Sequence, residues 1–232
     1  MKKLITLGSL LLLAFQVAQA QYFIDPSVTM RFKGQGTVTL TNGEVIEGTL
    51  GGYSMKKGLV KKLWVTSMDG EKLKLKGDQI QAFAFPPSEY SKVVSAVNGA
   101  TNITRLGNGA SIDEVLDRDM IYFEQGTIPG RKPLDLMMQL INPGFDSKIK
   151  VYHNPRGETN VGTSVGGIPV SATIVKSYYV KKDGVVMLIE RKQYDEQFME
   201  LFGDCPELLE AYPNPKWGDF AEHVFYYDQG CN

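Results

Sequence analysis

The sequence predicts a mainly β protein with a helical C-terminus, an α+β chain in which a small β-barrel precedes an antiparallel sheet and a short helical tail. Two-residue turns at 42–43, 69–70 and 183–184 each separate two runs of strand-forming residues, which is a strong hairpin signal. Apolar residues recur at helical spacing mainly within 194–202 and 220–227. The strands therefore belong to the larger, earlier part of the chain.

The first twenty residues have the pattern of a secretory signal peptide. Lys2 and Lys3 precede the apolar run Leu4–Val17, and the small-residue site 18–20 follows. We expect cleavage to leave a mature chain that begins at Gln21. No later segment approaches the roughly 20 apolar residues of a membrane span, so we expect no transmembrane segment in the mature chain. The expected location is the periplasm or the extracellular medium, in soluble form.

Composition narrows the class of partner. The chain has 232 residues and a formal net charge of −1, whereas nucleic-acid-binding proteins are usually strongly basic. The charge is unevenly spread, because residues 31–76 are basic and residues 195–232 are acidic. We interpret both as solvated faces, with docking of one end on the other as the alternative. The expected partner is a protein or an envelope component, and not nucleic acid.

Residues 21–98 are expected to form the barrel and a capping helix. Five short strands are predicted within 36–85. Their order, and the opening VTLTNGEVIEGTL, resemble a small SH3-like or Sm-like barrel. After the prolines at 86 and 87, Ser88 is a suitable N-cap for a helix that ends before Gly99. RNA binding, which Sm proteins perform, is not expected in an exported chain.

The connection Gly51–Lys62 is expected to be a mobile loop, because glycines stand at 51, 52 and 58. It carries the sharpest local cluster of basic residues, which is a candidate interaction site made of Lys56, Lys57, Lys61 and Lys62. Such a loop could bind lipid headgroups or lipopolysaccharide phosphates of an anionic envelope surface. The competing interpretation, a solvated edge loop, is the one we favour.

The second half is predicted to be a linker with a short helix at 99–118 and an antiparallel sheet region at 119–192. The stretch 157–167 is interpreted as a loop over this sheet. The turn at 183–184 fixes the register of a hairpin in which Lys182 faces Val185, and one face is expected to be buried while the other is at most half covered. The same register places Val180 opposite Met187 and Tyr178 opposite Ile189.

Residues 193–232 form the predicted helical tail, and both cysteines of the chain, Cys205 and Cys231, lie at the ends of apolar stripes in it. Two cysteines in an exported chain favour a disulfide. The alternative is two buried free thiols. A bond would close a loop of about 27 residues and stabilise the tail by roughly 3–4 kcal/mol on the chain-entropy model.

A resemblance supports the same compartment. The signal peptide, the hairpin YYV-KDG, the segment LFGDCPEL and the terminal cysteine resemble a group of uncharacterised exported proteins of Gram-negative bacteria. This resemblance implies export and a Cys205–Cys231 bond, and it implies no catalytic residue. The proline-rich join at 214–217 departs from this pattern and leaves the angle of the last helix open.

Residues for chemistry are sparse in the sequence. His153 follows a strand and His223 lies in the last helix one turn after Asp219, and we expect both histidines at the surface. We predict no cofactor, no metal ligand and no catalytic residue. The leading hypothesis is a non-catalytic envelope or secreted interaction protein, and the alternative is a hydrolase-like enzyme that uses His153 with nearby carboxylates.

Overall fold

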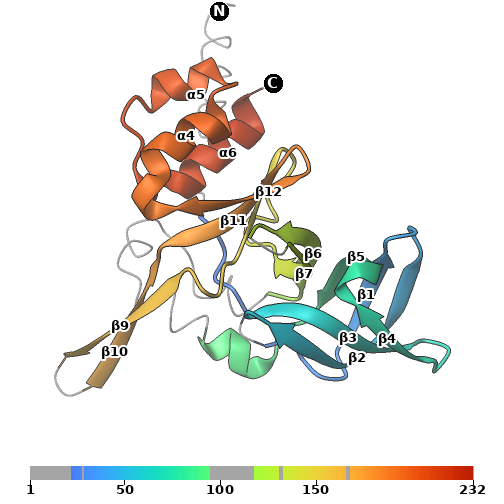
Figure 1. Cartoon of the computed structure of the whole chain (residues 1–232). Coiled ribbons are helices and arrows are strands. Elements are labelled where there is room, and N and C mark those ends of the chain that lie inside the picture. Colours follow the sequence, from blue (N-terminus) through green and yellow to red (C-terminus); the bar gives the residue numbers. More distant parts are fainter. Residues whose placement is uncertain (1–21, 28, 95–117, 131–132, 166–167, 232) are drawn as a thin grey trace, which may run out of the picture.

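The computed structural model describes residues 22–27, 29–94, 118–130, 133–165 and 168–231 (Figure 1). The predicted signal peptide and most of the predicted linker at 99–118 lie outside these residues. Among the described residues, the architecture is mainly β with helices at the C-terminal end, as the sequence predicts.

Six strands close into an antiparallel barrel in the order β2-β1-β5-β6-β7-β3, and β3 pairs with β2 to complete the ring. A further strand, β4 (Lys72–Lys76), extends the sheet from β3. The barrel strands are β1 (Gln35–Leu40), β2 (Val45–Lys56), β3 (Leu59–Ser67), β5 (Ile80–Phe85), β6 (Ile121–Ile128) and β7 (Leu134–Gln139). A short 3₁₀ turn, η1 (Gly77–Gln79), links β4 to β5.

The barrel is not confined to the N-terminal part, which differs from the expected division at 98 and 119. β6 and β7 were expected in a separate sheet, but β6 pairs with β5 and the Val60–Met137 pair joins β3 to β7. Phe83 of β5 stacks on Phe123 of β6 inside the barrel, with ring centroids 4.6 Å apart. Local patterns do not encode such a pairing between distant segments, since it is fixed by burial of the shared core.

The expected mobile loop at 51–62 is wrong, because β2 and β3 continue through it. Their turn is Lys57-Gly58, where both residues have positive φ, 57° and 82°, as in a two-residue hairpin turn. The register shifts near Gly51 and again between Ser54 and Met55, so the extra residues are accommodated as bulges. Glycine in this stretch therefore marks bulges and a tight turn.

The helix predicted after the two prolines is present, with residues 89–94 helical among those described. Ser88 caps it as expected, because the backbone N–H of Ser91 donates to the Ser88 Oγ at 3.1 Å. Thr29 also hydrogen-bonds the Ser88 hydroxyl, which ties the chain before β1 to this helix.

A second sheet of three strands is formed by β8 (Ile149–Tyr152), β11 (Ser177–Lys182) and β12 (Val185–Glu190). The register of β11 with β12 is the predicted one at all three expected pairs. On its helix-facing side Val180 and Ile189 are buried. The opposite side of the hairpin is partly covered, as expected: Tyr179 is buried against Leu136 and Met138 of the barrel wall, whereas Glu190 is exposed.

Between β8 and β11 the chain forms a two-stranded hairpin, β9 (Glu158–Val165) and β10 (Ile168–Val175), which extends away from the body in Figure 1. The loop expected at 157–167 is therefore mostly strand. The glycines and serines suggested a loop, but the β-branched residues Thr159, Val161, Thr163 and Val165 alternate, which favours extended backbone.

The helices cover the outer side of the three-stranded sheet, so the layers run barrel, sheet, helices (Figure 1). The helical part comprises η2 (Arg191–Gln193), α4 (Tyr194–Phe202), α5 (Pro206–Ala211), η3 (Trp217–Asp219) and α6 (Phe220–Gly230). Phe23 lies among them, with its ring 5.4 Å from that of Phe220. The first described residues are thus built into the same core.

Candidate functional site

The most polarised surface is the outer face of β2, β3 and β4. Leu63 and Val65 of β3 and Leu75 of β4 point into the barrel core, so the intervening residues of these strands point outward. Cross-strand pairing arranges these outward residues in three rows: Thr49–Thr66–Lys72, Gly52–Trp64–Lys74 and Ser54–Lys62–Lys76. Every row ends in a lysine of β4, and none contains a carboxylate.

Aromatic rings lie at the centre of this face. Gly52 leaves room beside Trp64, because a Cβ at Gly52 would lie 3.6 Å from the Trp64 ring and 4.0 Å from the ring of Phe32. The Lys74 ammonium lies 5.7 Å from the Trp64 ring centroid, within cation–π range. Phe32 is 62% exposed although it is a large apolar residue. We call this surface the basic–aromatic face, and it consists of Phe32, Lys62, Trp64, Lys72, Lys74 and Lys76.

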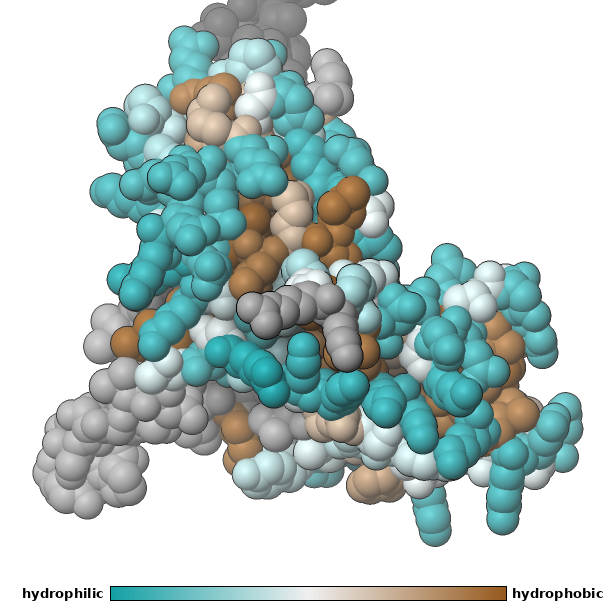
Figure 2. All heavy atoms as spheres, in the orientation of Figure 1, coloured by the Kyte–Doolittle hydropathy of each residue, from teal (hydrophilic) through white to brown (hydrophobic). Residues whose placement is uncertain are grey.

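The lysines of the basic–aromatic face lack ionic partners within the described part of the chain. None of the ion pairs found there involves them. Lys62 and Lys76 face each other directly across the ladder, an arrangement in which like charges repel. Figure 2 shows hydrophilic side chains projecting from the part of the molecule that Figure 1 labels β2, β3 and β4. The face therefore presents four lysines that no described carboxylate pairs with directly.

The four lysines predicted as an interaction site divide between two places. Lys56 and Lys57 lie at the β2–β3 turn. Of the four lysines only Lys62 is partly buried, and the other three are exposed. Lys62 belongs to the basic–aromatic face, whereas Lys61 occupies the bulge beside it. The prediction missed the lysines of β4. Their signal was the alternation KLKLK at 72–76, which puts three lysines on one side of a strand.

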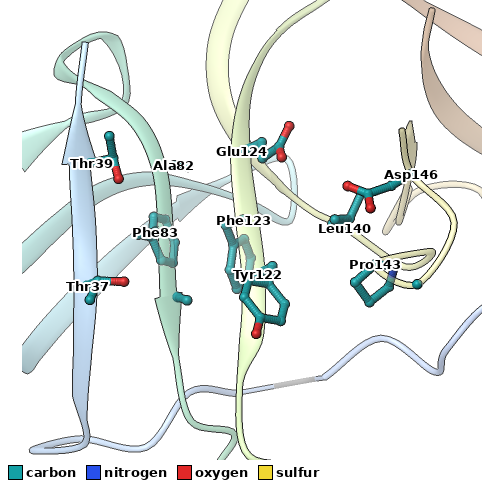
Figure 3. Close-up of a pocket in the computed structure, with 12 residues that line it drawn as sticks. Thr37, Thr39, Ala82, Phe83, Tyr122, Phe123, Glu124, Leu140, Pro143 and Asp146 are labelled. Carbon is teal, nitrogen blue, oxygen red and sulfur yellow. The ribbon is translucent and has the colours of Figure 1, made fainter. Parts of the chain in front are cut away.

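A second concave surface lies on the outer face of β1, β5 and β6 and has a volume of about 690 Å³. Its floor is low because two of the three lining residues of the middle strand are the alanines at 82 and 84, which lie between Thr37 and Thr39 of β1 and larger residues of β6. The third lining residue of this strand is Phe83. Figure 3 shows the two threonines on one side and the 140–146 segment on the other. This groove has room for a small side chain or ligand, and no local pattern in the sequence indicates it.

One end of the groove holds a network of charged groups. Glu124 accepts hydrogen bonds from the Lys150 ammonium at 2.5 Å and from the Tyr152 hydroxyl at 2.8 Å. Asp146 lies 3.6 Å from the same ammonium. Burial raises the pKa of Asp146, with Lys150 acting in the opposite direction and Glu124 adding to the increase. Burial and the Glu124 carboxylate raise the pKa of Tyr152. Lys150 thus neutralises part of the acidic charge where the barrel meets β8.

His153 lies at the end of β8, as expected, and is partly buried. Its Nε2 is 2.9 Å from Glu158 Oε1, so the carboxylate that an enzymatic role requires is present. Neither residue lines the groove.

His223 corrects the sequence prediction of a surface histidine. It is 0% exposed, enclosed by aromatic rings of α4 and by Tyr212, and its Nδ1 lies 2.7 Å from the Tyr194 hydroxyl. Burial lowers its pKa to about 4. His223 and Phe220 lie three residues apart, on one side of α6, so the apolar stripe of this helix carried the signal for burial.

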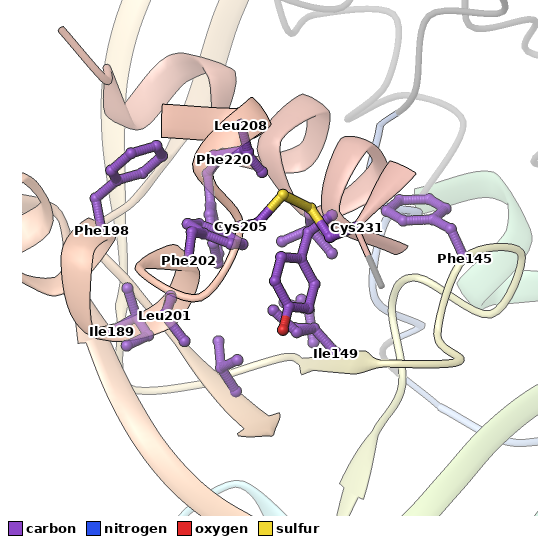
Figure 4. Close-up of a cluster of buried hydrophobic side chains, with 14 of the residues drawn as sticks. Phe145, Ile149, Ile189, Phe198, Leu201, Phe202, Cys205, Leu208, Phe220 and Cys231 are labelled. Atoms are coloured by element: carbon purple, nitrogen blue, oxygen red, sulfur yellow. A yellow bond between two sulfur atoms is a disulfide. The ribbon is translucent and has the colours of Figure 1, made fainter. Parts of the chain in front are cut away.

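Cys205 and Cys231 form the predicted disulfide, with their Cα atoms 5.6 Å apart. Both are buried in the helical core, and Figure 4 shows the bond between the segment after α4 and the end of α6. Nearby, the Lys182 ammonium donates to the carboxylate of Asp204 at 2.8 Å, and the Tyr227 hydroxyl donates to the same carboxylate. The tail is therefore fixed covalently and by polar contacts.

Comparison of the chain with protein-family models, with curated proteins and with solved structures found no match. Within the described residues, no group of three or more histidine, cysteine, aspartate or glutamate side chains is arranged to hold a metal ion. The helices among those residues are too short or too polar to cross a membrane.

Proposed function

We propose that the chain is an exported, non-catalytic interaction protein of the cell envelope or the extracellular medium. The observation that carries the interaction role is the basic–aromatic face, where four lysines have no ionic partner among the described residues and a phenylalanine of the same face is exposed. A surface of this kind is stabilised when a complementary partner covers it. The partner is a protein or another envelope component.

One observation supports export, and a second agrees with cleavage of the predicted signal peptide. The buried Cys205–Cys231 bond is of the kind that persists in oxidising compartments. The predicted cleavage after Ala20 leaves only two residues before Phe23, which packs against Phe145 and Phe220 in the helical core. Removal of the signal peptide at that site would leave the mature chain anchored close to its new N-terminus.

The SH3-like interpretation is kept as a proposal about the architecture of the barrel, with its bounds corrected. The strands β1 to β5 follow one another in the expected order, but the ring closes only with β6 and β7, which lie beyond residue 98.

The second candidate function is hydrolysis with His153 as general base. The specific observation in its favour is the His153–Glu158 contact of 2.9 Å, since a carboxylate orients such a base. This candidate predicts hydrolysis of an ester or peptide substrate that His153→Ala abolishes and that changes in the lysines leave intact.

Affinity capture of the mature protein from the periplasm or medium of a Gram-negative host tests the proposed function. We expect a component that the wild-type chain retains and that is lost when Lys62, Lys72, Lys74 and Lys76 are all changed to glutamine. A control with the same loss of four positive charges changes Lys176, Arg191, Lys192 and Lys216, exposed residues outside that face, to glutamine. Recovery of the protein alone, together with a hydrolytic activity that depends on His153, would favour the enzyme instead.

A further inference from the structure

We propose that the basic–aromatic face binds the phosphate-bearing headgroups of an anionic lipid surface. This inference rests on the proposed function, because an exported chain meets envelope membranes. It places the contact on the outward side of β3 and β4, and not on the tip of the β2–β3 hairpin.

The charge of the face is complementary to a layer of phosphates. Adjacent strands lie about 4.8 Å apart, and alternate residues along one strand lie about 7 Å apart. The ammonium groups of the face therefore share a small area of the sheet; they belong to Lys62, Lys72, Lys74 and Lys76. Their mutual repulsion is unrelieved in the free chain, since no carboxylate pairs with them among the described residues. A sheet of headgroups supplies one anion to each ammonium without any change of backbone.

The aromatic residues fit the same partner. Phe32 is 62% exposed, and the indole of Trp64 lies beside it across Gly52, with the Lys74 ammonium over the ring. Aromatic side chains favour the boundary between headgroups and acyl chains, while lysine stems extend along apolar surface to reach phosphates. Free inorganic anions can pair with the lysines but offer no apolar layer for the aromatic rings. A lipid surface provides both phosphates for the lysines and an apolar layer for the rings.

The competing explanation is that the lysines only protect an edge strand. Among the described residues β4 pairs with a strand on one side only, and charged residues on such an edge strand prevent pairing with another chain. That explanation requires charge on the strand, but it does not account for an exposed ring beside the lysines. It predicts no affinity for vesicles, which separates the two explanations in one experiment.

Co-sedimentation of the mature protein with vesicles tests the proposal. One set of vesicles contains equal parts phosphatidylglycerol and phosphatidylcholine, and the other contains phosphatidylcholine alone. We expect binding to the anionic set only, weakened by added salt because exposed charges are screened over about 10 Å at 0.1 M. Each Lys→Gln change should lower the affinity about five-fold, equivalent to about 1 kcal/mol per lysine. The quadruple variant Lys62, Lys72, Lys74 and Lys76→Gln should lose measurable binding.

The test variant is Lys72→Gln, Lys74→Gln, which changes two lysines of the face. The control variant is Lys176→Gln, Lys192→Gln, which has the same net charge but leaves the face intact. We expect the control to bind as the wild type does. Equal losses in the two variants would show a general charge effect and overturn the proposal. So would absence of binding, binding to both vesicle sets, or retention by a soluble anionic polymer such as heparin without any binding to vesicles.

Tryptophan fluorescence gives a readout of contact that does not depend on charge. The chain has two tryptophans, Trp64 on the face and Trp217 in the helical part. Brominated phosphatidylglycerol should quench emission of the wild type but not the remaining Trp217 emission of a Trp64→Phe variant. Unquenched emission in the wild type at saturating vesicle would contradict the proposed orientation.

The two proposals fail in different ways. A processed, exported protein that ignores anionic vesicles would leave the proposed function standing and end this inference. A chain that retains residues 1–20 and stays in the cytoplasm would end the proposed function, whatever its purified form does with vesicles.

Discussion

Reduction of the Cys205–Cys231 bond should destabilise the protein by about 3–4 kcal/mol. The two cysteines are 26 residues apart, and on the chain-entropy model a loop of that length lowers the entropy of the unfolded chain by about 12 cal/mol/K, or about 3.5 kcal/mol at 25 °C. Both side chains are buried against α4, α5 and α6, so the native packing of the reduced thiols should change little.

Urea unfolding with and without reductant measures this difference. With a slope of about 2–3 kcal/mol per M, the midpoint should fall by about 1–2 M on reduction. The Cys205→Ala, Cys231→Ala variant is the control, because its midpoint should not respond to reductant. A midpoint that is the same for oxidised and reduced wild type would refute the reasoning, since the tail would then be stable without the bond.

Three further predictions concern single residues. The pKa of His223 is about 4 when folded and about 6.5 when unfolded, so the unfolding free energy should fall by about 3 kcal/mol as pH drops from about 6.5 to 4. Urea titrations at several pH values check this, and His223→Leu should remove that part of the pH dependence; an unchanged profile would contradict it. Phe23→Ala should cost about 3–5 kcal/mol, because the buried ring packs on Phe220; a loss below about 1 kcal/mol in the same assay would show that the first residues are not part of the core. Gly36→Ala should lower the free energy of unfolding by roughly 1–3 kcal/mol, since the new Cβ would lie 2.1 Å from the carbonyl oxygen of Ala84. Thermal unfolding measures this loss, and Gly43→Ala is the comparison variant, because Gly43 lies in an open turn where a Cβ meets no atom and only the positive φ causes strain.

Local chemistry predicted the hairpins, and tertiary contacts decided the rest. The turn at Asp183-Gly184 has positive φ at both residues, 51° and 80°, which fixes the register of its strands without help from other segments. Closure of the barrel depends instead on the Val60–Met137 pair, whose partners are far apart in the chain. No periodicity within one segment carries that information.

Of the two candidate surfaces, one could be predicted from local sequence and the other depends on tertiary contacts. The lysines of β4 could be placed on one side from the alternation at 72–76, once that segment is known to be a strand. The groove could not be predicted, because it arises where Ala82 and Ala84 of β5 lie between residues of two other strands. Burial of His223 was encoded in the stripe of α6, but a polar side chain with one hydrogen-bonding partner was not expected there.

Intact mass spectrometry of the protein recovered from periplasm and medium, without reductant, tests export. We predict a chain that begins at Gln21 and is lighter by two hydrogens than its reduced form, because Cys205 and Cys231 are joined. A full-length chain of 232 residues with two free thiols, found only in the cytoplasm, would contradict it.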